Sequence, residues 1–525
     1  MTHTIRQSDI LIIGGGLGGC AAAIAAAKSG KRVIMTEETD WIGGQVTNQA
    51  VPPDEHRWIE QFGCTRTYRA FRDKIREYYK RTFPLTPEAT ANPRFNPGNA
   101  IVSRLCVEPR AALAVLEEML APYVHSGAVT ILTEVRPVAA ETDGSRVTSV
   151  TVRHTVSGEE ERLAAPYVLD ATELGDLLPL AGIEYVSGAE SKAETGEPNA
   201  LDGDAEPGDI QSFTIVFAMD YREGEDHTIA KPDDYEFWLK YRASFMKDVM
   251  LSWATSNLSP FKSYSLFKTP EKGVFPLWDY RRSIDKSNFA PGTFDSDITL
   301  VNWPQNDYWL GSIIDVSDEE RERHIRRAKN LSLSLLYWLQ TEAPRPDGGK
   351  GYPGLRLRKD VLGTADGLAK APYIRESRRI RAEFTVLEQH VNPAIHGRKE
   401  AVKFDDSVGV GCYRIDLHPT TGGREGFYIP VSPFQIPLGS LIPVRVDNVL
   451  PACKNIGVTH LTNGCYRLHP VEWNIGEAAG YLAAYCLETG LTPRDVRNTE
   501  QYLRDFQNRL VRAGIELDWP VVEPV

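Results

Sequence analysis

A cluster of glycines near the N-terminus limits the possible folds more than any other feature of the chain. Residues 14–19 read Gly-Gly-Gly-Leu-Gly-Gly. They follow an apolar segment, residues 9–13, that predicts a buried strand, and they overlap the start of an alanine-rich segment, residues 17–29, that predicts a helix. Residues 32–37 predict a second buried strand. This order is typical of the βαβ unit that opens a Rossmann-like α/β domain.

The spacing of the glycines also predicts a ligand. Gly14, Gly16 and Gly19 match the pattern GxGxxG. In that pattern the first glycine permits a tight turn, the second lets a pyrophosphate approach the backbone, and the third lets the helix pack on the strand. The free N–H groups at the helix start favour phosphate. Glu37, at the end of the second strand, suits ribose hydroxyls and would repel a 2′-phosphate. The motif therefore predicts a dinucleotide site that disfavours NADP.

Composition narrows the remaining functions. The 525 residues exceed one ordinary domain. With 71 acidic and 59 basic residues the net charge is −12, which offers no broad basic surface, so no nucleic-acid partner is expected. The sequence shows no signal-peptide pattern and no apolar run of membrane length, and its seven cysteines are widely spread. We expect a cytoplasmic protein with no membrane partner, no disulfide framework and no metal site, and we leave a homo-oligomer open.

Changes in composition predict three sections. Residues 1–185 form the first part of the nucleotide-binding domain, residues 186–404 form an inserted α+β substrate domain that holds most of the tryptophans, and residues 405–525 return to complete the first domain. Within the insert, Ser317 is expected to cap a long amphipathic helix that runs through Thr341.

Local patterns predict further elements. The proline-rich residues 78–98 are interpreted as an ordered loop. A helix rich in glycine and alanine is expected to open at Gly476. The other expected elements are a helix at residues 110–123 and strands at residues 129–132, 147–153, 167–170 and 449–452.

Four segments together resemble a known family. They are the glycine motif with Glu37, residues 41–45 (Trp-Ile-Gly-Gly-Gln), residues 167–176 and residues 448–480. On these segments the chain resembles the bacterial FAD-dependent oxidoreductase family of the glutathione-reductase-like flavoprotein superfamily, with a single dinucleotide fold. Trp41 and Gln45 stand where many relatives have arginines, and Glu173 replaces a usual glycine.

The resemblance implies a three-layer β/β/α domain, assembled from both ends of the chain, with FAD as the cofactor. Small residues are expected where the late helix meets the flavin. A second nucleotide motif is not expected, because the candidate at residues 409–414 ends in arginine. The residues implied to contact FAD are Gly14, Gly16, Gly19, Glu37, Gly43, Gly44, Gln45, Val135, Ala171, Thr172, Gly476, Ala478 and Ala479.

The segment 458–470, just before the late helix, supplies candidate catalytic groups. A neutral histidine can take a proton from a substrate hydroxyl or amine while a hydride passes to flavin N5, and an arginine can anchor a carboxylate. His460 is the first choice as base, with Arg467 and His469 next and His418 as a second group. Each histidine can equally be a structural residue.

Two other segments are candidates for a substrate pocket. Residues 373–379 are rich in arginine, so that Arg375 or Arg378 could bind substrate, although salt bridges with nearby acids are the commoner role. Residues 302–308 form a polar–aromatic segment suited to a pocket wall or to a surface turn.

The leading functional hypothesis is a flavin-dependent dehydrogenase or oxidase that acts on a small polar molecule. One alternative is a flavin monooxygenase that uses transiently bound NAD(P)H. Another is a flavin-dependent RNA-modifying protein, which the acidic charge opposes. The sequence does not identify the substrate.

Overall fold

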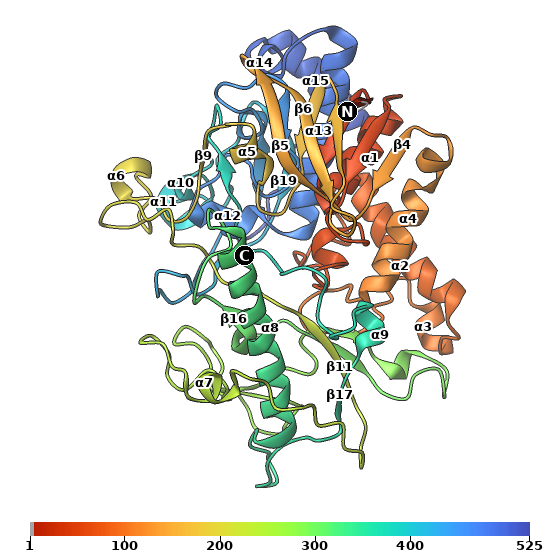
Figure 1. Ribbon diagram of the computed structural model, residues 1–525, viewed down its shortest axis with the longest axis vertical. Helices are drawn as coiled ribbons and strands as arrows, with labels where there is room; N and C mark the ends of the chain where they lie inside the picture. Colours follow the sequence, from red (N-terminus) through yellow and green to blue (C-terminus); the bar gives the residue numbers. More distant parts are fainter. Residues whose placement is uncertain (1–4, 525) are drawn as a thin grey trace.

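The computed structural model describes residues 5–524. A five-stranded sheet forms the centre of the upper part in Figure 1. Its strands run in the order β23-β8-β2-β3-β4, and all neighbours are parallel. The strands are β2 (Ile10–Ile13), β3 (Val33–Thr36), β4 (Val129–Leu132), β8 (Tyr167–Asp170) and β23 (Val449–Pro451). Because β23 pairs with β8, the C-terminal part of the chain completes the sheet that the N-terminal part begins.

Each face of this sheet packs against a different hydrophobic core, as the alternating side chains of β2 show. Ile10 and Ile12 face the first hydrophobic core, which contains the alanines of α1 (Leu17–Lys28). Leu11 and Ile13 face another core that contains Val150 and Leu163 of a second sheet. The domain is therefore the expected three-layer β/β/α arrangement.

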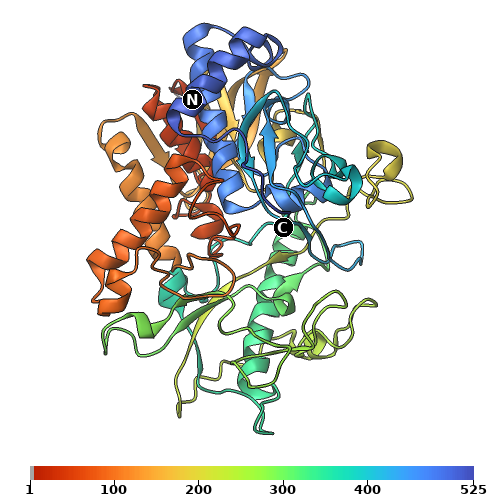
Figure 2. The ribbon, with the colours of Figure 1, turned by 180° about the vertical axis from the view of Figure 1, so that it is seen from behind.

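The helix layer brings the ends of the chain together. Helix α1 packs along α13 (His469–Thr489), and both figures of the whole chain show these red and blue helices side by side (Figures 1 and 2). Helix α4 (Pro109–His125) joins the same core. The outer sheet has the order β1-β7-β6-β5. Its strands are β1 (Ile5–Gln7), β5 (Val135–Asp143), β6 (Arg146–His154) and β7 (Glu160–Ala164).

A third sheet, separate from the five-stranded sheet and the outer sheet, lies in the lower half of Figure 1. Its four strands have the order β14-β15-β11-β17 and run antiparallel. Along β11 (Phe217–Tyr221), Ala218 belongs to the first core, whereas Phe217 and Met219 belong to a separate core that also contains residues of α8 (Asp318–Thr341). The sheet thus lies between the two cores. The other strands are β14 (Arg282–Ile284), β15 (Ile298–Val301) and β17 (Leu355–Leu357).

Shorter elements connect these layers. The remaining helices are α2 (Arg66–Thr82), α3 (Pro87–Ala91), α5 (Leu177–Leu180), α6 (Lys192–Thr195), α7 (Tyr235–Lys240), α9 (Lys359–Leu362), α10 (Glu388–Val391), α11 (Pro393–His396), α12 (His460–Tyr466), α14 (Pro493–Asn498) and α15 (Glu500–Ala513). The remaining strands are β9 (Tyr185–Val186), β10 (Phe213–Thr214), β12 (Ser263–Ser265), β13 (Val274–Pro276), β16 (Asp307–Tyr308), β18 (Arg379–Ile380), β19 (Ser407–Gly411), β20 (Ile415–Leu417), β21 (Phe427–Ile429) and β22 (Phe434–Pro437).

The long helix α8 confirms the prediction made from its capping signal. The Ser317 side chain accepts a hydrogen bond from the Glu320 N–H at 3.2 Å, and the helix ends at Thr341. Among residues 5–524, no helix combines the length and the apolar character that crossing a bilayer requires.

Two local predictions were wrong. Residues 78–98 are not one loop, because α2 continues to Thr82 and α3 follows it; the prolines fall between and around the helices. Helix α13 begins at His469 rather than at Gly476. Pro470 lies in its first turn, where the missing N–H costs nothing because no partner is available there in any case.

Candidate functional site

The glycine motif forms one wall of a narrow pocket at the carboxyl ends of the parallel strands, the place where open α/β sheets bind ligands. Gly14 has a φ of +104°, which favours glycine, and it lies directly against the backbone of Ala171 and Thr172. We call the space of about 80 Å³ lined by Gly14, Gly16, Glu37, Val135, Ala171, Thr172, Glu173 and neighbouring residues the nucleotide pocket.

Glu37 reaches this pocket from the end of β3. Its carboxylate accepts hydrogen bonds from the N–H of Gly15 at 3.1 Å, from the N–H and hydroxyl of Thr39 at 3.0 Å each, and from Asn48 Nδ2 at 3.0 Å. Burial raises the pKa of Glu37 to about 8, although the Thr39 donors oppose that shift. The geometry holds the carboxylate beside the glycine turn, where a ribose hydroxyl can donate to it.

Two glycines approach each other where the phosphates of a dinucleotide would bind. A Cβ placed on Gly44 would lie 2.9 Å from the Gly16 Cα, and a Cβ placed on Gly16 would lie 2.8 Å from Glu173 Oε1. That carboxylate oxygen is buried and has no hydrogen-bond partner among the described residues. The two side-chain-free backbones leave room for a pyrophosphate, whereas the unpaired Glu173 oxygen is an acceptor and calls for a donor rather than for a phosphate oxygen.

Charged residues surround this point. Lys454, which is buried, forms an ion pair with Glu173 and lies 3.7 Å from Glu472. Glu472 Oε1 accepts a hydrogen bond from the Gly18 N–H at 3.2 Å, and its other oxygen accepts one from Gln45 Nε2. Lys454 is thus a buried cation next to the glycine motif, and the sequence analysis missed it.

The late helix α13 packs closely against the glycine motif. A Cβ on Gly476 would collide with the backbone of Gly18, and one on Gly19 would collide with the backbone of Gly14. Ala478 and Ala479 are buried in the same core. Gly476 lets α1 and α13 approach closely, and Gly19 lets α1 pack on the turn at Gly14. The N-terminal turn of α13 lies seven residues before Gly476, at His469. Gly43, with a φ of +108°, begins the short turn that leads to Gln45.

A short extended segment separates the nucleotide pocket from a second space. Pro372 and Ile374 line the nucleotide pocket, whereas Tyr373 and Arg375 line the other space. Successive side chains of an extended segment point to opposite sides, so residues 372–375 form a shared wall. This part of the arginine-rich segment therefore faces both a cofactor site and a second cavity.

The second space is the largest of the cavities described here, at about 510 Å³, and we call it the large cavity. Its charged lining residues are Asp54, Glu55, Arg57, Arg281, Arg375, Arg414, Asp416 and Arg467, and the histidines His56 and His418 also line it. Its aromatic lining residues are Phe261, Tyr264, Phe275, Tyr280, Trp303, Tyr373, Tyr413 and Tyr428. Its size and its mixture of aromatic walls with a few converging polar groups are typical of a small-molecule site.

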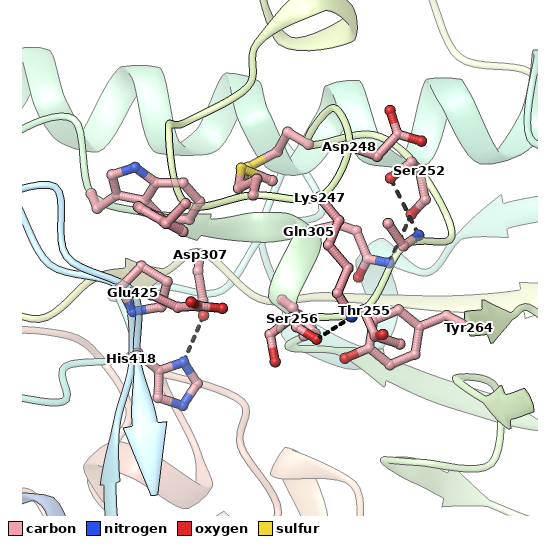
Figure 3. A pocket seen from close by; sticks show the side chains of 18 of the residues that line it. Lys247, Asp248, Ser252, Thr255, Ser256, Tyr264, Gln305, Asp307, His418 and Glu425 are labelled. Atoms are coloured by element: carbon pink, nitrogen blue, oxygen red, sulfur yellow. Dashed lines mark hydrogen bonds and ion pairs between the residues drawn. The ribbon is translucent and has the colours of Figure 1, made fainter. Parts of the chain in front are cut away.

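His418 lines three cavities in this region. They are the large cavity, an adjoining cavity of about 120 Å³ drawn in Figure 3, and a third cavity of about 80 Å³. Its Nδ1 lies 2.6 Å from Asp307 Oδ2, the contact marked by a dashed line in Figure 3. Its Nε2 lies 3.8 Å from Asp416 Oδ1, beyond hydrogen-bond distance. One ring nitrogen is therefore held, and the other is available.

Asp307 is itself fixed. Its Oδ1 lies 2.9 Å from Arg375 Nη2 and accepts a hydrogen bond from the Thr214 hydroxyl at 2.7 Å. Burial alone would raise the pKa of Asp307, but the charges of Arg375 and His418 lower it to about 2. An ionised Asp307 orients the His418 ring and keeps the proton on Nδ1.

Arg467 also lines the large cavity. Its Nη1 donates to the Tyr373 hydroxyl at 3.0 Å, its Nη2 donates to the Asp416 carbonyl at 3.2 Å, and the same nitrogen lies 3.7 Å from the Asp416 carboxylate. Burial would raise the pKa of Asp416, but the charges of His418, Arg467 and Arg414 lower it.

The other two candidate histidines lie elsewhere. His460 is the first residue of α12, and its Nδ1 lies 2.9 Å from Glu376 Oε1. It lines the third cavity together with His418. In His469, Nδ1 accepts from the Asp54 N–H at 3.1 Å and Nε2 donates to the Val51 carbonyl at 3.1 Å, so both ring nitrogens are occupied by backbone groups. Burial lowers the pKa of His469 to about 4, which keeps the ring neutral.

An ion pair in the large cavity is not apparent from the sequence. Arg281 Nη1 lies 3.3 Å from Asp54 Oδ1, and both side chains are nearly buried. The two residues are 227 positions apart, and no sequence motif joins them. The only local signal is that Asp54 follows the glycine loop and two prolines.

Comparison with known proteins finds a family match over most of the chain. Residues 9–510 match the model of a family described as FAD dependent oxidoreductase. A soluble pyridine nucleotide transhydrogenase from Chromohalobacter salexigens is 37% identical over 71 residues, which span 13% of this chain and 15% of that protein.

Solved structures provide distant likenesses. A geranylgeranyl bacteriochlorophyll reductase-like protein from Thermoplasma acidophilum is 12% identical, with a TM-score of 0.33 over 98% of this chain and 85% of that one. A myxobacterial FAD-dependent chondrochloren halogenase is 17% identical, with a TM-score of 0.23 over 43% of this chain and 46% of that one.

Proposed function

Since the chain belongs to the FAD-dependent oxidoreductase family, we propose that it oxidises a small polar substrate in the large cavity, with His418 as the base. FAD is the cofactor, and when bound it supplies the two-electron acceptor. Gly14, Gly16 and Gly44 would hold the phosphates, and Glu37 would accept from the ribose. The observation that carries the proposal is the Asp307–His418 pair at the wall of the large cavity.

Oxidation of an alcohol or an amine removes a hydride from carbon and a proton from oxygen or nitrogen. With its Nδ1 proton held by Asp307, the neutral form of the His418 ring can take the substrate proton at Nε2, which has no hydrogen-bond partner among the described residues. Asp307 stabilises the positive charge that the ring then acquires. Arg467 and His418 both lie near the Asp416 carboxylate, each close to a different oxygen. Arg467 can therefore hold the substrate in place beside His418. We therefore rank His418 ahead of His460, and we propose that His469 supports the backbone at Asp54.

A screen for reducing substrates tests the reaction. The yellow holoenzyme is mixed anaerobically with a set of small alcohols, hydroxy acids and amines, and the loss of flavin absorbance at about 450 nm is followed. We expect bleaching by a subset of these compounds without any nicotinamide cofactor. Bleaching only by NADH or NADPH, followed by oxygen-dependent insertion into a substrate, would favour the monooxygenase alternative.

A further inference from the structure

We infer that the substrate of the large cavity is a small hydroxy or amino carboxylate, whose carboxylate binds among the arginines and whose hydroxyl or amine faces Asp416 and His418. This inference rests on the proposed function, because it assumes that the large cavity is the substrate site. Its first support is charge. Five arginines and three carboxylates line the cavity, although the whole chain carries a net charge of −12. A cleft of opposite sign to the rest of the surface concentrates anions.

Not all of the arginines are neutralised inside the protein. Arg281 pairs with Asp54, and Arg375 pairs with Asp307. Arg414, in contrast, has no carboxylate within 4.0 Å anywhere in residues 5–524; its guanidinium lies 4.4 Å from the centre of the Tyr428 ring. Stacking holds this exposed charge at the lining of the cavity without cancelling it.

The second support is the balance of unsatisfied polar atoms. Among the described residues, the cavity lining has five buried donors without a partner and only two buried acceptors without one. The donors are Arg281 Nε, Asn302 Nδ2, Trp303 Nε1, Arg375 Nε and Arg467 Nε. Buried donors without partners are costly, so this excess favours a ligand rich in acceptors. A carboxylate offers acceptors alone, whereas a neutral sugar hydroxyl would bring a further donor with each acceptor.

The third support concerns the opposite end of the ligand. The unsatisfied acceptors are His56 Nδ1 and Asp416 Oδ1. Asp416 remains ionised because its pKa is lowered, so it requires a donor such as a hydroxyl or an ammonium group. His418 Nε2 and Arg467 Nη2 lie 3.8 Å and 3.7 Å from the two oxygens of this one carboxylate. A single small molecule can therefore place its carboxylate near Arg467 and Arg414, two of the arginines whose charges act on Asp416, and its reacting hydroxyl or amine at His418.

The oxidation balances on these groups. The bond between the reacting carbon and its hydrogen breaks, and that hydrogen leaves with its electron pair to the bound FAD. The proton of the hydroxyl or amine passes to His418 Nε2, and the product is an oxo or imino carboxylate. The carboxylate itself is unchanged and serves only for binding.

Paired probes test the substrate class on the holoenzyme. Mandelate is compared with mandelamide, malate with malamide, and gluconate with glucose, and dissociation constants are measured from changes in the flavin absorption spectrum and by calorimetry. We expect each carboxylate to bind roughly 10-fold or more tightly than its neutral counterpart, because a charge-assisted pair is lost in the latter. We also expect the preference to weaken as salt is added. Equal binding of both members of each pair would overturn the inference.

Variants locate the effect. Arg414→Gln should weaken carboxylate binding roughly 10-fold and leave the neutral compounds unchanged. Arg153→Gln is the matched control, since Arg153 is exposed on β6 and pairs with Glu160. Loss of affinity for both classes of probe in Arg414→Gln would contradict the inference.

The same probes separate this inference from the proposed function. Bleaching by a neutral alcohol, without preference for carboxylates, would retain the oxidation and reject the carboxylate site. Selective binding of carboxylates with no bleaching by any hydroxy or amino acid would retain the binding site and reject the oxidation.

Discussion

The nucleotide pocket and the large cavity share the wall formed by residues 372–375, but they are built by different means. The nucleotide pocket depends on backbone shape: a positive φ at Gly14 and the close approach of Gly16 and Gly44. The large cavity depends on side chains that come from distant parts of the chain and neutralise one another, such as Asp54 and Arg281. Backbone shape is specified by short-range spacing, whereas charge pairing of this kind depends on the tertiary fold.

The substitution with the largest expected effect disrupts the nucleotide pocket and leaves the protein folded. In Gly16→Val, the new Cβ meets the ends of two flexible side chains, Glu173 at 2.8 Å and Glu472 at 3.4 Å, but it fills the space for phosphate. We expect a folded protein that retains no FAD. In Gly476→Val, the side chain meets the backbone of α1, and we expect the fold itself to fail.

Absorbance of the purified proteins at the flavin band and their far-ultraviolet circular dichroism check this pair. If Gly16→Val were yellow, the glycine motif would not hold the phosphates. If Gly476→Val were folded but colourless, Gly476 would contact the cofactor as the sequence had suggested.

The next effect concerns the large cavity alone. His418→Gln removes the base but not the cofactor site, so we expect FAD to remain bound and substrate reduction of the flavin to slow by roughly 100- to 10,000-fold. Stopped-flow absorbance with a substrate found by the anaerobic screen measures that rate. His460→Gln serves as the matched variant, because His460 also has one ring nitrogen against a carboxylate. A slow His460→Gln together with a normal His418→Gln would return the base to His460.

The two regions also differ in how much of them the sequence predicts. The strand–glycine–helix unit and the α8 helix from Ser317 follow from local spacing, apolar periodicity and a capping residue, whereas the three-layer domain was implied by the family resemblance. The start of α13 was misplaced because the small residues after Gly476 were interpreted as a helix opening, while Pro470 in the true first turn was overlooked.

The large cavity was predicted only in fragments. Its walls at residues 302–308 and at Arg375 were recognised as polar–aromatic or arginine-rich segments, but their partners were not. Which of three candidate histidines faces the cavity depends on packing: His469 turns toward the backbone at Val51, and His418 turns toward Asp307. Such choices depend on contacts between residues far apart in sequence, which spacing alone does not encode.

A smaller effect, on stability, separates a structural histidine from a catalytic one. Burial lowers the pKa of His469 to about 4 in the folded protein, whereas in the unfolded chain it is near the ordinary histidine value of about 6.5. Below about pH 6.5 the unfolded chain binds a proton at His469, whereas the folded chain does not. The contribution of the neutral ring to the free energy of unfolding is therefore complete above about pH 6.5 and is lost as the pH falls toward 4. The linkage contributes about 3 kcal/mol over that range.

Thermal unfolding of His469→Gln across this pH range measures the contribution. At pH 7 we expect the variant to be less stable, because two hydrogen bonds to backbone are lost. The difference from the natural protein should narrow as the pH falls toward 4. A constant difference at every pH would mean that His469 does not resist protonation in the fold.

The smallest expected effect tests whether the inserted region contributes to the nucleotide pocket, because one side chain of α8 reaches that pocket. Arg321 lines that pocket and lies 3.9 Å from Glu38 Oε2. The Arg321 side chain is about a quarter exposed, so its contribution is screened by water. We expect Arg321→Gln to weaken FAD binding by roughly 2- to 5-fold in a titration of the apoprotein, as for a partly exposed ion pair. Arg323→Gln, on the same helix but paired with Glu320 at the surface, should leave the affinity unchanged.

If both variants bound FAD like the natural protein, the cofactor site would belong to the two ends of the chain alone. If Arg321→Gln lost FAD altogether, the inserted region would be part of the cofactor site, and the separation between a backbone-built pocket and a side-chain-built cavity would not hold.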